Sequence, residues 1–159
     1  MKRFGLLVST PVQINSLVAE FAVLDWRKSL EFYTEYLGFK IVFDRPKEGF
    51  VFLEFKGAQI MFYQANLERN LAADEAPLER PLGRGVNLQI QTDAIAPLVA
   101  KLEQGNVQLA LPPEERWYQV GDFNIGVLQF AVADLDGYLL RFSEAIGSHA
   151  IVEGTDIRC

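Results

Sequence analysis

The sequence predicts an α+β fold made of two βαβββ modules, each a strand, a helix and three further strands. In both halves of the chain, one helical pattern is followed by three short runs rich in aromatic and β-branched residues. The segments "KGAQIMFYQ" and "DGYLLRFSE" also align, with Gly57 on Gly137. An internal duplication explains this agreement better than a chance match of two hairpins.

The first module is expected over residues 17–66. Its helix, over 25–37, begins with Asp25 as N-cap and ends at Gly38, which supplies a left-handed stop. Apolar side chains spaced at three and four residues give this helix one buried face. Strands are predicted at 17–24, 39–44, 50–55 and 58–64.

The second module is expected over residues 86–147 and repeats this order. Its helix starts after Asp93, the predicted N-cap, and stops at Gly105. Residues 112–125, which open with two prolines, read as a long loop. Strands are predicted at 86–91, 107–111, 126–133 and 138–144.

Three segments flank or join the modules. Residues 1–16 are expected to form an N-terminal arm, 67–85 a linker, and 148–159 a C-terminal tail. The linker mixes charge, proline and glycine, which is typical of an exposed connection.

Composition excludes several classes of partner. The formal net charge of −6 opposes binding to nucleic acid, because it removes the counterion release that drives such binding. No run approaches the roughly 18 apolar residues that span a bilayer, so no membrane partner is expected. Cys159 is the single cysteine, which favours a reducing compartment, and we expect a cytoplasmic protein.

The segments "DWRKSLEFYTEYLGF" and "DLDGYLLRFSEAIG", placed on two βαβββ modules, resemble the vicinal-oxygen-chelate superfamily. The resemblance covers roughly residues 17–147 and is nearest to the glyoxalase/bleomycin resistance branch. It implies the glyoxalase/bleomycin resistance/dioxygenase-like fold. Metal-dependent members resemble one another in binding a divalent ion through His, Gln or Glu at four places.

Those four places are the start of each module's first strand and the position four residues after each hairpin glycine. The matching residues here are Val18, Met61, Asn87 and Arg141. Two of them offer no oxygen or nitrogen, and the arginine adds a fixed positive charge. We therefore expect neither a metal nor another cofactor. A shifted first-strand register would place Glu20, rather than Val18, in the cavity.

Proteins of the bleomycin-resistance type resemble one another in forming homodimers whose interface crevices bind a cationic, aromatic drug without chemical change. The resemblance thus implies a metal-free protein that sequesters a cationic or aromatic small molecule, with a bleomycin-like antibiotic as one candidate. Arg141 would pair with Glu20, with Glu54 or with an anionic group of the ligand. An ion pair of purely structural purpose is equally open.

Aromatic residues on the predicted loop and on one strand face supply the remaining candidates. Alternation along 50–55 places Phe50, Phe52 and Glu54 on one face of their strand. The candidate ligand-binding residues are therefore Glu20, Phe50, Phe52, Glu54, Trp117, Tyr118, Phe123 and Arg141.

Two other functions remain open. One is a lyase, isomerase or glutathione transferase of the same superfamily, with a metal held by residues in another register or with Glu20 and Tyr63 or Tyr118 as acid and base. The other is a regulatory or scaffold domain, which predicts an exposed apolar patch outside the crevice. The sequence favours a protein without catalysis, since its single histidine rules out most Ser/His/Asp arrangements.

Overall fold

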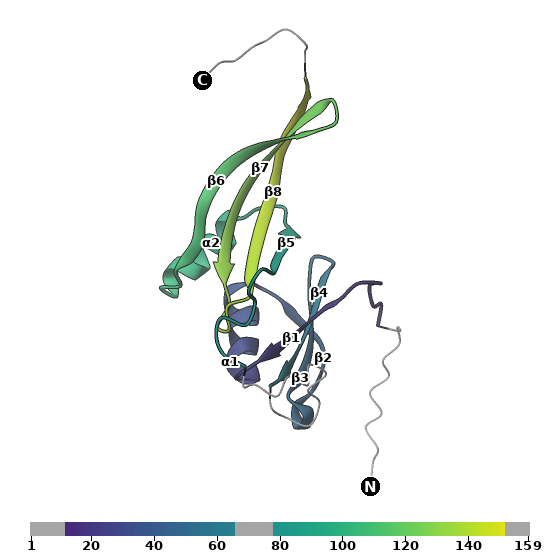
Figure 1. The fold of residues 1–159 in the computed structure, drawn as a ribbon, viewed down its shortest axis with the longest axis vertical. Helices are drawn as coiled ribbons and strands as arrows, with labels where there is room; N and C mark the ends of the chain where they lie inside the picture. Colours follow the sequence, from purple (N-terminus) through teal and green to yellow (C-terminus); the bar gives the residue numbers. More distant parts are fainter. Residues whose placement is uncertain (1–11, 66–77, 152–159) are drawn as a thin grey trace.

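The structure, a computed structural model, describes residues 12–65 and 78–151 and contains two four-stranded sheets (Figure 1). The first sheet has the order β1-β4-β3-β2 and the second β5-β8-β7-β6, and in each sheet the first two strands are parallel. The first sheet comprises β1 (Ala19–Val23), β2 (Lys40–Arg45), β3 (Phe50–Phe55) and β4 (Ala58–Gln64). The second comprises β5 (Asn87–Gln91), β6 (Leu109–Val120), β7 (Phe123–Ala133) and β8 (Leu139–Ala150). The predicted fold of two βαβββ modules is confirmed.

The predicted arm, linker and tail include residues that lie outside the described part of the chain, so their boundaries stay predictions. None of the described helices is long and apolar enough to cross a membrane.

The helix of the first module forms as predicted. Helix α1 (Trp26–Glu31) continues as a π-helical turn, η1 (Phe32–Tyr36), and the Asp25 side chain accepts a hydrogen bond from the Lys28 amide at 3.2 Å. Gly38 adopts the left-handed conformation, with φ of 74°, and ends the element. A short 3-10 turn, η2 (Pro46–Glu48), joins β2 to β3.

The predicted start of the second helix is wrong. Helix α2 (Ala96–Gln104) has Ile95 at its N-cap, and the Ile95 amide donates to Glu144 Oε2 of β8 at 3.0 Å. Asp93 instead forms an ion pair with Lys56 of the first module. A carboxylate from a neighbouring strand therefore replaces the local cap, which local sequence could not indicate.

Gly105 ends α2, as predicted, but it does not adopt the left-handed conformation seen at Gly38. Its φ is −81°, a conformation open to any residue, but a Cβ placed there would lie 2.2 Å from Cε1 of Tyr36. Glycine is needed because the ends of the two helices meet at this point.

The predicted loop over 112–125 is also wrong, because most of it is strand. β6 continues to Val120 and turns through Gly121, with φ of 59°, into β7. Pro112 and Pro113 are tolerated because β6 is an edge strand whose pairing with β7 is irregular between Leu111 and Glu114. Residues 115–127 and 145–150 form a three-stranded extension, here named the distal ribbon, that projects away from the first sheet (Figure 1).

One hydrophobic core joins the two modules. The inner faces of both sheets pack with α1, η1 and α2 into a continuous cluster. At the junction, the rings of Phe21 and Tyr138 stack at 4.2 Å, and the buried Tyr33 hydroxyl donates to Asp134 Oδ2 at 2.9 Å. The other face of each sheet, here called its outer face, points away from this core.

Candidate functional site

Polar side chains gather on the outer face of the second sheet. Strand alternation turns Ile90, Leu140 and Phe142 inward to the core and their neighbours outward. Strand register then aligns Gln89 with Arg141, and Gln129 with both Ser143 and Glu114. This surface is here named the Arg141 face and consists of Gln89, Glu114, Arg116, Tyr118, Gln129, Arg141 and Ser143.

Hydrogen bonds organise one half of the Arg141 face around a buried glutamine. Gln129 is only 2% exposed, and its amide nitrogen donates to Glu114 Oε1 at 2.9 Å and to the Tyr118 hydroxyl at 3.1 Å. Glu114 Oε1 also lies 3.1 Å from Arg116 Nε. The hydrogen bonds from Arg116 and Gln129, with a smaller contribution from the charge of Arg141, lower the pKa of Glu114. Glu114 is therefore ionised and already occupied by donors of its own chain.

Arg141 differs from its neighbours because its Nε is buried without a partner. No hydrogen-bond acceptor for this atom is found among the described residues, and the ion pairs of 12–65 and 78–151 do not include Arg141. The expected pairing with Glu20 or Glu54 is thus not formed within the chain. A buried donor left without a partner costs about 1–3 kcal/mol, and more for a charged group.

On the first sheet, the two phenylalanines that were predicted to contact the ligand are buried. Phe50 and Phe52 share the outer face, as expected, but they are 6% and 1% exposed. Phe43 stacks on Phe52 at 5.0 Å, and the Arg45 guanidinium lies over the Phe50 ring at 3.9 Å. These rings are packed side chains, so the structure gives their predicted ligand contact no support.

The two acidic candidates of the first sheet have different surroundings. Glu54 Oε1 accepts from the Gly57 amide at 2.6 Å and so stabilises its own hairpin turn. Glu20 is exposed and lies opposite Met61 on the same face as Tyr63. Burial, and then the charge of Glu20, raise the pKa of Tyr63, which keeps that phenol protonated.

The three aromatic residues of the predicted loop do not lie together. Tyr118 belongs to the Arg141 face, whereas Trp117 lies on the opposite side of the ribbon. Trp117 packs on Gly126 and near the His149 ring, and its Nε1 donates to Glu115 at 2.7 Å. Phe123 sits beside the hairpin turn and is 53% exposed.

Sequence reasoning missed Gln129 as the centre of the polar network. The available signal was a glutamine within the apolar run "GVLQFAVA", since a buried polar side chain needs hydrogen-bond partners. The partners themselves, Glu114 and Tyr118, come from the part of β6 that the sequence predicts to be a loop.

The four residues at the positions that match the metal ligands of metal-dependent members do not suit a divalent ion. Met61 and Arg141 occupy the outer faces of their sheets, and neither a thioether nor a guanidinium is a ligand for a hard cation. Only the weak carbonyl oxygen of Asn87 remains, since Val18 has no donor atom. Across the described ranges, no group of three or more His, Cys, Asp or Glu side chains converges.

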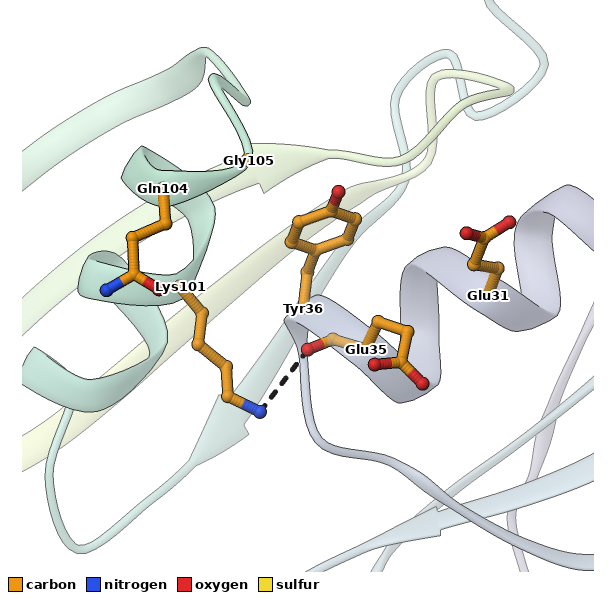
Figure 2. A pocket seen from close by; sticks show the side chains of 6 residues that line it. All are labelled: Glu31, Glu35, Tyr36, Lys101, Gln104 and Gly105. Atoms are coloured by element: carbon orange, nitrogen blue, oxygen red, sulfur yellow. Dashed lines mark hydrogen bonds between the residues drawn. The ribbon is translucent and has the colours of Figure 1, made fainter.

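A shallow hollow of about 420 Å³ lies where the two helices meet (Figure 2). Its lining residues are Glu31, Glu35, Tyr36, Lys101, Gln104 and Gly105. Lys101 Nζ donates to the Glu35 carbonyl at 3.3 Å across it. The hollow contains none of the predicted ligand residues and lies on the helical side of the second sheet, away from the Arg141 face.

Residues 13–142 match the family model of the Glyoxalase/Bleomycin resistance protein/Dioxygenase superfamily. The chain belongs to this superfamily. The recognition made from the sequence is therefore confirmed. Comparison with curated protein sequences gives no match.

Comparison with solved structures finds several similar chains. A superfamily member from Vibrio splendidus 12B01 is 32% identical over 81% of this chain and 97% of its own, with a TM-score of 0.37. Virulence protein STM3117 from Salmonella typhimurium is 24% identical over 85% of this chain and 100% of its own, with a TM-score of 0.60. TioX from Micromonospora sp. ML1 is 16% identical over 83% of this chain and 99% of its own, with a TM-score of 0.64. The latter two establish likeness of fold alone.

Proposed function

We propose that this chain is a metal-independent small-molecule-binding protein whose ligand lies on the Arg141 face. The observation that carries the proposal is Arg141 itself, whose buried Nε has no partner among the described residues. It stands at one of the four places where metal-dependent members resemble one another in carrying His, Gln or Glu. Tyr118, which is 45% exposed and hydrogen-bonded to Gln129, supplies an accessible ring on the same face for an aromatic ligand. Binding without chemical change is the expected outcome of such a site.

An enzyme that uses Glu20 and Tyr63 is the second candidate. Both residues lie on the outer face of the first sheet, and the charge of Glu20 contributes to the raised pKa of Tyr63. A phenol with a raised pKa is a poor base at neutral pH, so Tyr63 would serve only as an acid. A catalytic activity of the wild-type protein that is lost in the Tyr63→Phe variant would support this candidate over ligand sequestration.

A homodimer is part of the proposal. The distal ribbon exposes apolar side chains, with Val120 at 54% and Phe123 at 53%, and exposed apolar patches favour contact with another protein surface. A second copy of the chain would cover this patch and enclose the ligand crevice. Sedimentation of the wild type and of the double variant Val120→Ser/Phe123→Ser tests the proposed dimer. The wild type should be dimeric and the variant monomeric, and a monomeric wild type would contradict the proposal.

The test of binding uses two adjacent residues on opposite sides of one strand. Aromatic compounds, with metal-free bleomycin among them, are titrated calorimetrically into chelator-treated protein. Saturable binding should weaken in Tyr118→Ala and stay unchanged in Trp117→Ala, because only Tyr118 belongs to the Arg141 face. Equal weakening in both variants, or loss of binding after chelation of the wild type, would refute the proposed site.

A further inference from the structure

The acidic groups that a cationic ligand would need are largely occupied by donors of the chain itself. Glu114 accepts from Arg116 and Gln129, and Glu115 accepts from Trp117 Nε1. Glu54, on the first sheet, is bound by the Gly57 amide. The resemblance implies a cationic ligand, which needs free acidic groups, but these three glutamates already accept hydrogen bonds from their own chain.

The free polar atom of the Arg141 face is a donor. The guanidinium of Arg141 offers only hydrogen-bond donors, and its buried Nε has no acceptor among the described residues. The groups around it are Gln89 on β5 and the small side chain of Ala131 on β7, with Glu114 near enough on β6 for its pKa to be lowered by Arg141. The neighbouring strands therefore leave the Nε edge of the guanidinium without an acceptor.

Ser143 adds a second donor to the same surface. Its Oγ accepts a weak hydrogen bond from the Gln89 side chain at 3.4 Å, so its own hydroxyl hydrogen is available to another acceptor. Ser143 stands two residues beyond Arg141 on β8 and points to the same side. Together they place a planar guanidinium and a hydroxyl on one side of β8, and a guanidinium is suited to the two oxygens of a carboxylate.

We propose that the ligand of the Arg141 face carries an anionic oxygen group, of the carboxylate class, that accepts hydrogen bonds from Arg141. This inference rests on the proposed function for the location of the site and specifies the charge of its ligand. The expected ligand is therefore an aromatic or apolar anion, and not the cation that the resemblance implies. Its ring lies towards Tyr118.

The probes are aromatic ring systems, each prepared in three matched forms: carboxylate, primary amide and aminomethyl cation. Naphthalene and quinoline derivatives are suitable, and binding is measured by ligand-observed NMR and calorimetry at pH 7. The affinity of the carboxylate form should be at least about 10-fold higher than that of the amide form, as expected for a hydrogen bond to a charged group. The cation should bind most weakly.

Two variants and a control assign this preference to Arg141. Arg141→Gln should remove the preference for carboxylate, and Arg141→Lys should keep part of it, because the charge remains while the planar donors are lost. Arg27→Gln is the control, since Arg27 is an exposed arginine on α1 whose guanidinium lies over Trp26. Circular dichroism confirms that each variant is folded, and Arg141→Lys keeps the test valid if Arg141→Gln does not fold.

The outcomes separate this inference from the proposed function. Binding with no charge preference, tighter binding of the cations or of bleomycin, or a carboxylate preference that survives Arg141→Gln would overturn the anionic ligand while leaving a binding protein. Absence of saturable binding by every probe would overturn both. A third outcome is that no probe binds and that sedimentation shows a wild-type dimer which dissociates in Arg141→Gln. Arg141 would then pair with a second copy of the chain, which also overturns the inference.

Discussion

The buried hydrogen bond between Tyr33 and Asp134 gives the most quantitative prediction, because it joins the two modules inside their shared core. Tyr33 is 0% exposed, and its hydroxyl lies 2.9 Å from Asp134 Oδ2. Tyr33→Phe removes the donor and leaves a mostly buried carboxylate with one fewer partner. At pH 7 we expect the free energy of unfolding to fall by about 1.5–3 kcal/mol, the range for hydrogen bonds to charged groups.

The size of this loss should depend on pH. Burial raises the pKa of Asp134 in the folded state, outweighing the hydrogen bonds from the Tyr138 amide, the Tyr33 hydroxyl and the Asp136 amide, which lower it. A carboxyl with a raised folded pKa binds its proton more tightly in the native state. Its contribution to stability is therefore largest below the unfolded pKa and decreases as pH rises through the folded pKa. Tyr33→Phe removes one of the contacts that lower this pKa, so the variant should lose more stability at pH 7 than in acid.

Urea unfolding of both proteins, at one protein concentration and at pH 7 and pH 4, measures the two losses. In a chain of this length, the loss at pH 7 corresponds to a decrease in Tm of roughly 3–12 °C. Tyr36→Phe is the matched control, since Tyr36 lines the open hollow and its hydroxyl is not among the hydrogen bonds found in the described residues. A loss that is equal at the two pH values, or larger in acid, would refute the assignment of a charged acceptor.

Four further predictions concern the second helix and the metal. Gly105→Ala should destabilise the protein by about 1–3 kcal/mol because its Cβ would overlap the Tyr36 ring, and Tyr36→Ala should rescue part of that loss in a thermal-melt double-mutant cycle. Glu144→Ala should cost about 0.5–2 kcal/mol in urea unfolding because the Ile95 amide loses its acceptor. Asp93→Ala should change stability by less than about 0.5 kcal/mol because its ion pair is exposed, and a larger effect than that of Glu144→Ala would restore Asp93 as the cap. Treatment with EDTA should leave the melting temperature and ligand binding unchanged, and a decrease in either would indicate a bound metal.

Local patterns were sufficient where one segment carries the whole signal. The first helix needed only Asp25, an apolar face and Gly38, all within one stretch of chain, and the structure forms each of these features. The repeated hairpin around Gly57 and Gly137 was equally local, and both glycines have positive φ values. Such signals depend on neighbours in sequence, so they can be predicted before the fold is known.

The distal ribbon shows where this reasoning fails. Residues 112–125 contain two prolines and many charged residues, which indicate a loop when the segment is considered alone. In the structure residues 112–120 belong to a strand because β7 pairs with that strand, and its position at the sheet edge tolerates the prolines. This pairing also decides that Tyr118 joins the Arg141 face while Trp117 does not.

The sequence by itself determined the module and its repetition, because periodicity and turn glycines act over short distances along the chain. Its two motif segments resemble the superfamily to which the chain belongs. The sequence also determined which atom types occupy the expected metal positions. Only the tertiary structure decided which polar groups are already paired. Glu144 accepts a hydrogen bond from the Ile95 amide, and Gln129 donates to Glu114 and Tyr118. Within the described part of the chain, Arg141 Nε has no acceptor. A hydrogen bond depends on atoms brought within 3.5 Å by strand pairing, and spacing along the chain does not specify that proximity.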